Sequence, residues 1–286
     1  MSLIDTTIRG IDVSVYQGSI EWTKVRASGI RFAMLKASQG RSVTNASLYL
    51  FRDSTFLSNV RGASSAGVLC GAYHYLTAQT AAEAVKEAED FLSVIKPYAD
   101  RLPLGAAVDV EDSRLPSDRD ALTAIVRAFC GVVKRAGFDC MVYTNPDFLT
   151  YRLGNLSEYG LWLALWRDKN RLPASSAYPN LRIWQWGRET VNGISASSDG
   201  VSAAVDADFA DGTWFSSLSV GRTEMSVDKA ETFSDDKAEN VAEEPDYAAE
   251  VCRIAGLSGV TRTYLEKYTW SADLFRKLYR AMKTTK

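Results

Sequence analysis

Carboxylates recur at the ends of short apolar segments of this 286-residue chain. Five of them fall at or beside the end of a segment that reads as a strand: Asp12, Asp109, Glu111, Asp206 and Asp208. The i, i+2 spacing of Asp109 and Glu111 turns both side chains to the same face of their strand. In a closed barrel of parallel strands, the carboxyl ends of the strands meet at one opening, and the first and last strands are neighbours. We therefore expect four or five acids to crowd around one mouth.

Like charges crowded in a partly desolvated site raise the pKa of at least one carboxyl group. A carboxylic acid that stays protonated near neutral pH can protonate the leaving oxygen of a glycosidic bond, while a second carboxylate stabilises positive charge at the sugar carbon. A polyacidic mouth also suits a divalent metal ion, which keeps metal-dependent hydrolysis open. A single acid after a strand is more often a turn former or helix cap, so the functional interpretation depends on the recurrence.

Aromatic side chains at or beside the same strand ends favour a sugar substrate, because aromatic faces stack on sugar rings. The candidates are Tyr73, Tyr143, Trp166 and Trp186, with Tyr75 and Trp184 beside them. Taken singly, each would more often be core or rim packing. The one histidine, His74, alternates with tyrosines on either side and is expected to point away from the mouth into a buried hydrogen bond. The four cysteines have no CxxC spacing, which predicts free buried thiols and no zinc site.

Eight near-continuous apolar runs predict strands covered on both faces, as in a parallel sheet. They span 8–14, 32–38, 68–76, 104–111, 140–145, 161–166, 182–187 and 203–209. Helical patterns separate the early strands, at 20–28, 48–66, 80–95 and 117–136. Later connections are rich in Pro, Asn, Ser and Gly and predict at most a short turn each. The expected fold class is α/β: an irregular TIM-like (β/α) barrel of eight strands with fewer than eight helices, plus a small C-terminal α-helical module.

Charge divides the chain into unlike parts. The overall balance of 33 basic against 35 acidic residues argues against a general nucleic-acid binder. Residues 222–250 carry ten acidic against three basic side chains, which is typical of a solvated linker, whereas residues 251–286 carry eight basic against two acidic. We expect a catalytic barrel at 1–218, an acidic linker at 219–245 and a small helical module at 246–286.

Targeting signals are also read from the sequence. The chain has no run of about 18 apolar residues that could span a membrane. Its first residues, MSLIDTTIRGIDVS, lack the basic start and apolar core of a signal peptide. We therefore expect no membrane insertion, and a protein that needs help to leave the cytoplasm in which it is made.

An ordered series of motifs resembles the glycoside hydrolase family 25 muramidases, the lysozyme type common among phage endolysins and bacterial autolysins. The series covers most of residues 8–210: GIDVSVYQG at 10–18, FAMLKASQG at 32–40, GAYHY at 71–75, AVDVED at 107–112, VYTNP at 142–146, LWLALW at 161–166, IWQWG at 183–187 and VDADF at 205–209. Any one motif is weak, but their order is specific. The resemblance implies hydrolysis of the β-1,4 bond between N-acetylmuramic acid and N-acetylglucosamine in peptidoglycan, with no metal and no other cofactor.

The resemblance also assigns roles to residues of this chain. Glu111 matches the family's general acid and Asp109 its partner in a D-x-E motif, and Asp12 and Asp206 match acids that line the same cleft. The candidate sugar contacts by position are Tyr73, Tyr143, Trp166 and Trp186. Asp208 stands where the family commonly has Asn in a D-x-N-x-F segment, and either alters the pKa values of the cleft or faces outward.

Several alternatives stay open at this point. A catalytically inactive barrel that binds glycan is one, although a pure binding module has no need for a costly cluster of acids. The reaction itself could be substrate-assisted, with the N-acetyl group as internal nucleophile, or could proceed through a covalent carboxylate intermediate or an inverting water attack. That choice depends on the carboxyl separation.

The C-terminal segment 247–283 resembles the short three-helix cell-wall-binding repeats of some phage lysozymes. A cationic module on a flexible tether would hold a hydrolase near an anionic wall and raise its effective concentration there. The expected partners are peptidoglycan glycan strands and, through this module, anionic wall polymers. The expected place of action is the bacterial cell wall, after release from the producing or phage-infected cell. An oligomerisation or docking helix pair is the alternative for the module.

Overall fold

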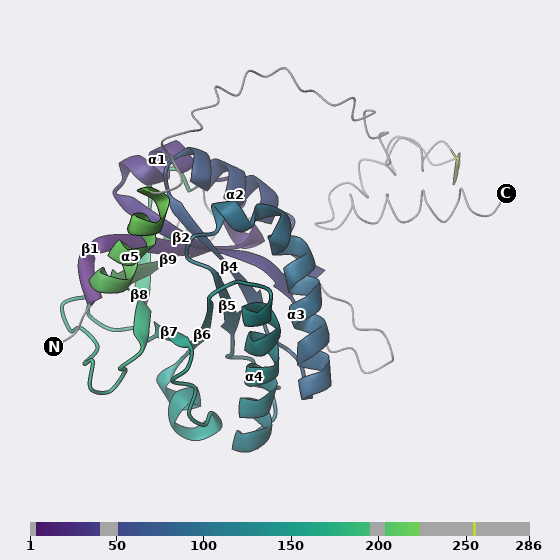
Figure 1. Ribbon diagram of the computed structural model, residues 1–286. Coiled ribbons are helices and arrows are strands. Elements are labelled where there is room, and N and C mark those ends of the chain that lie inside the picture. The colour runs from purple at the N-terminus through teal and green to yellow at the C-terminus, as the bar shows by residue number, and fades with distance from the viewer. Residues whose placement is uncertain (1–3, 41–50, 195–203, 224–253, 256–286) are drawn as a thin grey trace. The chain divides into compact units, whose positions relative to one another are not determined.

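The computed structural model describes residues 4–40, 51–194, 204–223 and 254–255, with side chains in the third range described to residue 218. Eight of its strands close into a barrel in the order β1, β2, β4, β5, β6, β7, β8 and β9, and β9 pairs again with β1 (Figure 1). Their bounds are β1 Ile4–Val13, β2 Ile30–Gln39, β4 Leu69–Tyr75, β5 Ala106–Asp109, β6 Cys140–Thr144, β7 Gly160–Ala164, β8 Leu181–Thr190 and β9 Ala204–Asp211. A two-residue strand, β3 (Phe51–Arg52), pairs antiparallel with β2. The expected eight-stranded, TIM-like barrel is thus confirmed.

The last strand of the barrel runs against the expected direction. β9 is antiparallel to both β8 and β1, whereas β1, β2 and β4 to β8 pair in parallel. Because β9 is antiparallel to β8, it starts at the mouth, at the end where β8 finishes. The expectation that Asp206 and Asp208 end a parallel strand was therefore wrong. Asp206 still pairs with Asp12 at the mouth, and Asp208 lies deeper, opposite Gly10.

Five α-helices are assigned within the described residues. They are α1 Trp22–Ala27, α2 Phe56–Ser65, α3 Ala81–Ile95, α4 Arg119–Arg135 and α5 Gly212–Thr223. Side chains cap the N-termini of α3 and α4. The Thr80 side chain accepts a hydrogen bond from the backbone N–H of Glu83, and the Asp118 side chain accepts one from the backbone N–H of Ala121. Among the described later crossovers, only 148–152 forms a helical turn, of the π type, as the thin sequence pattern predicted.

The helix α5 was missed by sequence analysis. It crosses the expected domain boundary at 218, and the division between two compact units of the chain falls between Val227 and Asp228. Its sequence, GTWFSSLSVGRT, has a weak apolar stripe and two glycines, so periodicity gives little signal. The expected linker at 219–245 and helical module at 246–286 lie outside the described residues, apart from the end of α5 and the exposed helical residues 254 and 255.

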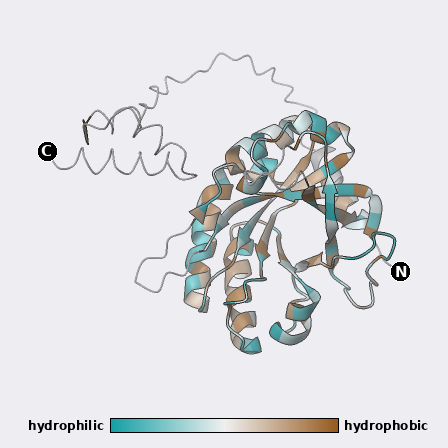
Figure 2. Cartoon of the chain, turned by 180° about the vertical axis from the view of Figure 1, so that it is seen from behind, coloured by the Kyte–Doolittle hydropathy of each residue, from teal (hydrophilic) through white to brown (hydrophobic). Residues whose placement is uncertain are grey.

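Two apolar layers position the strands. One fills the barrel and contains Phe32, Met34, Tyr73, Met141, Trp162 and Ile183. The other lies between the outer faces of the strands and the helices, with Phe91 of α3 and Phe129 of α4 fully buried in it. Hydrophobic residues accordingly concentrate on the strands, whereas the helices carry both kinds of residue (Figure 2). No helix among the described residues has both the length and the apolar character needed to cross a membrane.

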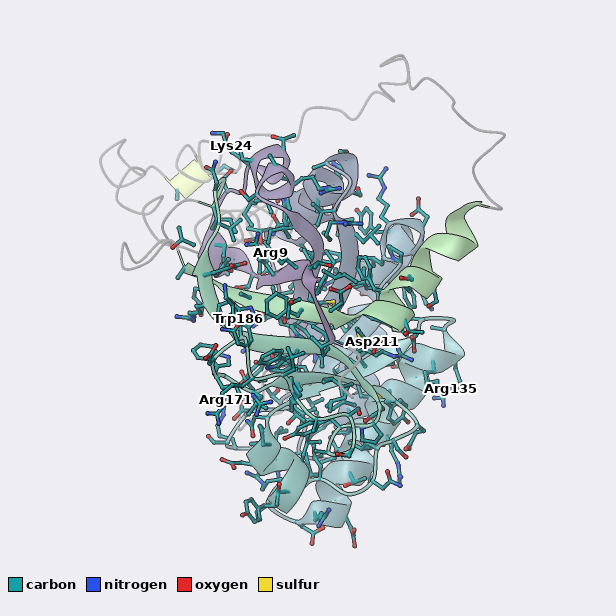
Figure 3. The ribbon with its side chains drawn as sticks, turned by 90° about the vertical axis from the view of Figure 1, so that its left-hand side faces the viewer. Arg9, Lys24, Arg135, Arg171, Trp186 and Asp211 are labelled. Carbon is teal, nitrogen blue, oxygen red and sulfur yellow. The ribbon has the colours of Figure 1, made fainter. Side chains whose placement is uncertain are left out.

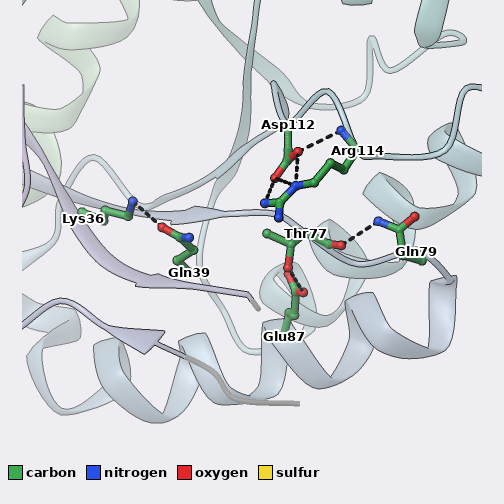
Figure 4. Close-up of polar contacts among 7 residues, drawn as sticks. All are labelled: Lys36, Gln39, Thr77, Gln79, Glu87, Asp112 and Arg114. Carbon is green, nitrogen blue, oxygen red and sulfur yellow. Dashed lines mark hydrogen bonds and ion pairs between the residues drawn. The ribbon is translucent and has the colours of Figure 1, made fainter. Parts of the chain in front are cut away.

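The histidine lies in the outer layer, as the alternation in GAYHY predicted. His74 is fully buried, and its Nδ1 and Nε2 lie 2.8 Å from Ser38 Oγ and 2.9 Å from Glu87 Oε2. Thr77 donates its hydroxyl to the other carboxylate oxygen of Glu87 at 3.0 Å (Figure 4). This buried polar network ties α3 to β2 and β4. Cys70, Cys130 and Cys140 are buried and free, as expected.

We predict that Glu87→Ala lowers the free energy of unfolding by about 3 kcal/mol or more, because it leaves His74 Nε2 and the Thr77 hydroxyl without their hydrogen-bond partner in the core. Glu89→Ala on the exposed face of the same helix is the matched control and should change stability by less than about 0.5 kcal/mol. Denaturant unfolding of both variants checks this. Equal stability of the two would contradict the role given to Glu87.

Candidate active site

The mouth of the barrel holds a cavity of about 550 Å³. It is lined by residues of the expected acidic cluster and by aromatic and basic groups, among them Asp12, Tyr16, Lys36, Tyr73, Asp109, Glu111, Tyr143, Trp162, Gln185, Arg188 and Asp206. Four of the five predicted acids therefore line one cavity. The barrel achieves this because Asp12 ends β1, Asp109 ends β5 and the antiparallel β9 brings Asp206 to the same level.

The D-x-E pair lies at and just beyond the end of β5. Asp109 is only 6% exposed, and its Oδ1 has no hydrogen-bond partner among the described residues. Glu111 is exposed at the cavity rim. Burial raises the pKa of Asp109 well above its ordinary value, with the Glu111 charge adding to it. Partial burial also raises the pKa of Glu111, with Asp206 as the next cause. The pair therefore holds protons more tightly than free carboxyl groups do.

A lysine faces the pair from β2. Lys36 donates to Gln39 Oε1 at 2.9 Å and lies 5.1 Å from the centre of the Tyr75 ring (Figure 4). Burial lowers the pKa of Lys36, and the charges of Asp109, Asp53 and Glu111 oppose that shift. In return, the lysine lowers the pKa of both Asp109 and Glu111. Sequence analysis missed Lys36, although a lysine inside the apolar run FAMLKAS was a usable signal.

A glutamine joins the opposite wall of the cavity. Gln185 of β8 is 2% exposed and donates from Nε2 to Asp12 Oδ2 at 2.8 Å. Its Oε1 accepts from the Tyr143 hydroxyl at 3.1 Å and from Trp166 Nε1 at 2.8 Å. One amide thus fixes an acid and two of the predicted sugar contacts. Burial, followed by the charges of Asp208 and Asp206, raises the pKa of Asp12 well above its ordinary value.

Asp206 has a basic partner. Arg188 of β8 donates from Nε to Asp206 Oδ1 at 2.6 Å, and its guanidinium lies 5.5 Å from the centre of the Trp166 ring. Trp166 is 56% exposed and lies beside the cavity, not in its lining. Arg188 therefore links an acid of the mouth to an exposed aromatic surface.

Aromatic rings form the floor of the cavity. Tyr73 and Tyr143, both 8% exposed, contact Trp162 edge-on with ring centroids 5.7 and 4.5 Å apart. The two tyrosines thus lie in the cavity as the sequence suggested, whereas Trp162 was not singled out. The pattern LWLALW resembles an ordinary buried strand, and nothing in it marks Trp162 as part of a site.

Two of the predicted substrate-binding residues lie elsewhere. Trp186 is on the outer side of β8 and stacks on Phe209 with ring centroids 5.9 Å apart, beside Trp184 (Figure 3). It does not line the cavity, because alternation along β8 turns Gln185 inward and its two tryptophan neighbours outward. Asp208 is 1% exposed and accepts from Trp162 Nε1 at 2.8 Å, below the cavity surface. We therefore leave Trp186 out of the proposed site and treat Asp208 as a supporting residue.

No group of three or more His, Cys, Asp or Glu side chains with metal-binding geometry occurs in the part of the chain that the structure describes. The donors that face the acids of the mouth are instead Gln185, Arg188 and Lys36, as set out above. The arrangement suits proton transfer between carboxyl groups and a polar, ring-shaped substrate.

Comparison with known proteins agrees with this site. The sequence model of glycosyl hydrolases family 25 matches residues 11–194. The autolytic lysozyme of Clostridium acetobutylicum is 32% identical over 194 residues, which cover 67% of this chain and 54% of that protein. Lysozyme M1 of Streptomyces globisporus is 28% identical over 206 residues, covering 67% and 66% of the two chains. The CTP1L endolysin structure superposes with a TM-score of 0.60 at 24% identity, covering 74% and 70%.

The fold and the site define a class, the barrel-shaped glycoside hydrolases with acids at the mouth. The comparison of sequences then defines the family. The chain belongs to glycosyl hydrolases family 25. It spans about half the length of the clostridial autolytic lysozyme and about two thirds of the streptomycete lysozyme. The matched region runs from the end of β1 to beyond β8 and contains Asp12, Asp109 and Gln185, whereas β9 follows it.

We predict that Lys36→Met raises the pKa of Glu111 and of Asp109, because a nearby cation favours the ionised form of a carboxyl group. Lys86→Met, on the exposed face of α3, is the matched control and should not move the titration of Glu111 or of Asp109. The measurement is the pH dependence of the carboxyl ¹³C chemical shifts. A Glu111 titration that does not move in Lys36→Met would contradict the electrostatic coupling.

Proposed function

We propose that this chain is a muramidase that hydrolyses the β-1,4 bond between N-acetylmuramic acid and N-acetylglucosamine in peptidoglycan and so lyses bacterial cell walls. Membership of glycosyl hydrolases family 25 supports this proposal, as does the likeness to proteins named autolytic lysozyme and lysozyme M1. The observation that carries it is the shared cavity, in which Glu111 and Asp109 meet Asp12 and Asp206.

Glu111 is the general acid in this proposal. Its position at the exposed rim lets it reach a glycosidic oxygen, and its raised pKa keeps a proton available at higher pH than an ordinary glutamate would. As the bond between the sugar carbon C1 and the oxygen breaks, the oxygen takes the proton of Glu111. The ionised Glu111 then accepts a proton from the water that completes hydrolysis.

Asp109 assists from below the rim. Its buried position beside Glu111 suits a group that orients the N-acetyl substituent of the sugar, whose carbonyl oxygen attacks C1 as the internal nucleophile. Asp109 lines the cavity beside Glu111, where its carboxylate is an acceptor for the amide N–H of that substituent. Asp12 and Asp206 add negative charge on the facing wall, which stabilises the positive charge that develops at the sugar ring.

The aromatic groups of the cavity supply the sugar contacts. Tyr73 and Tyr143 line the cavity, and Trp166, 56% exposed, lies beside it. Because Gln185 holds both Tyr143 and Trp166, the two contacts are fixed relative to Asp12 before a substrate arrives.

We predict that Glu111→Gln reduces wall lysis by about 10²–10⁴-fold, because an amide cannot protonate the leaving oxygen. The thermal unfolding temperature should stay close to that of the unchanged chain, since Glu111 is exposed at the rim. Glu89→Gln, an exposed glutamate on α3, is the control that should retain full lysis. Near-normal lysis by Glu111→Gln would overturn the assignment.

The bond that is cleaved is established by the sugar at the new reducing end. Purified peptidoglycan digested with the unchanged chain should yield muramic acid at that end, whereas glucosamine or a freed peptide amine would exclude a muramidase. A chelator-treated sample should show the same release, and loss of activity that a divalent ion restores would favour the metal-dependent alternative.

The C-terminal segment has a second role in this proposal. Residues 246–286, of which the structure describes only 254 and 255, act as a basic module that binds anionic polymers of the wall, and residues 219–245 act as its acidic tether. The charge counts support this, with eight basic against two acidic residues in 251–286. Tethering the barrel in this way raises its concentration at the glycan strands.

We predict that a chain ending at Val227, where the first compact unit ends, binds purified walls about 10–100-fold more weakly than the full chain. Its turnover of soluble glycan fragments should be retained, because those fragments do not depend on the tether. Wall binding is measured by cosedimentation. Equal binding of both chains would favour an oligomerisation or docking role for residues 246–286.

A further inference from the structure

Asp208 is a buried carboxyl group that the proposed reaction does not use. It lies on β9 opposite Gly10 of β1 and Gln185 of β8. Its Oδ1 accepts from Trp162 Nε1 at 2.8 Å. Its Oδ2 is buried and has no N–H or O–H donor among the described residues. An ionised carboxylate with one oxygen unsolvated and unpaired would be costly here.

Asp12 is the group that Oδ2 of Asp208 can pair with. The two side chains lie within hydrogen-bonding reach of each other. Ionised carboxylates only accept hydrogen bonds, so a bond between them requires that one carries a proton. Gln185 Nε2 donates to Asp12 Oδ2 and Trp162 Nε1 donates to Asp208 Oδ1, so each carboxyl group already has one donor. The proton of the bond between them is therefore assigned to the pair as a whole.

We propose that Asp12 and Asp208 share one proton near pH 7 and that the hydrogen bond between them holds Asp12 in place at the wall of the cavity. Asp208 is thereby a positioning residue that acts through Asp12. Its effect on catalysis rests on the proposed function, whereas the shared proton does not.

The charges around Asp208 agree with this proposal. Burial raises the pKa of Asp208 to about 8, and the charges of Asp206 on its own strand and Glu189 of β8 add to the rise. The bonds from Trp162 of β7 and with Asp12 of β1 lower that pKa. Two cations also face this region, but each is bound to an acid: Arg188 of β8 to Asp206 at 2.6 Å, and Arg9 of β1 to Glu189 at 2.7 Å. The nearest cations are therefore engaged elsewhere.

An amide at position 208 would reproduce the donor without titrating. Asparagine has the shape of aspartate, its oxygen can accept from Trp162, and its NH₂ can donate to Asp12 at any pH. Leucine has a similar volume and offers neither group. Asp208→Asn and Asp208→Leu therefore separate the hydrogen-bonding role from the packing role.

The stability of Asp208→Asn relative to the unchanged chain tests the protonation. If the pair holds one proton when folded and none when unfolded near pH 7, unfolding releases that proton, so the contribution of the pair to stability falls as pH rises above about 4. Asp208→Asn has no carboxyl group at position 208 and does not show this fall. Its unfolding temperature should therefore rise relative to that of the unchanged chain by about 5 °C or more between pH 5 and pH 8.

Two further measurements complete the test. The infrared carbonyl band of protonated carboxyl groups at pH 7 should lose the intensity of one group in Asp208→Asn. Release of reducing ends by Asp208→Leu should be at least 10-fold slower than by Asp208→Asn. A pH-independent stability gap with an unchanged infrared band would overturn the proposal, whether or not the chain cleaves peptidoglycan. If no form is active but the stability and infrared results are as predicted, the proposed function fails and the proton shared by Asp12 and Asp208 stands.

Discussion

The pairing of β1 with an antiparallel β9 is the constraint on which the rest of the site depends. It closes the barrel and places Asp206 directly opposite Asp12 at the mouth, with Asp208 below them. A parallel last strand would enter the barrel from the opposite end, and different residues would then lie opposite Asp12 at the mouth. The closure therefore decides which acids face each other, and the short parallel strand β5 supplies the remaining pair, Asp109 and Glu111, from across the cavity.

Such a cluster of acids is tolerable only because each carboxyl group has a specific way of reducing its charge or finding a donor. Asp206 has Arg188, Asp12 has Gln185 and Asp208 has Trp162. Asp109 and Glu111 share the field of Lys36 and retain raised pKa values because burial outweighs it. The site thus keeps protonated and ionised carboxyl groups side by side, which is the condition that acid-assisted cleavage of a glycosidic bond requires.

Sequence analysis predicted the barrel, the four acids that line its mouth and the buried His74, because strand ends and two-residue alternation are local properties. It could not predict the direction of β9, since an apolar run reads the same in both directions and its register depends on distant partners. Gln185 and Trp162 were missed because single polar or aromatic residues inside IWQWG and LWLALW resemble ordinary core. Trp186 was expected to contact the sugar but lies outside the cavity. The sequence could have indicated this, because alternation along the strand turns Trp186 outward if Gln185 faces the cavity.

The central claim is that Glu111 delivers a proton to a glycosidic oxygen while Asp109 holds the neighbouring N-acetyl group. A crystal structure of Glu111→Gln with a tetrasaccharide of alternating N-acetylglucosamine and N-acetylmuramic acid tests it most directly. The account predicts a glycosidic oxygen within hydrogen-bonding distance of residue 111 and an N-acetyl group against Asp109, with sugar rings on Tyr73, Tyr143 or Trp166. A sugar chain bound on the outer side of β8 around Trp186, with the mouth empty, would contradict the account.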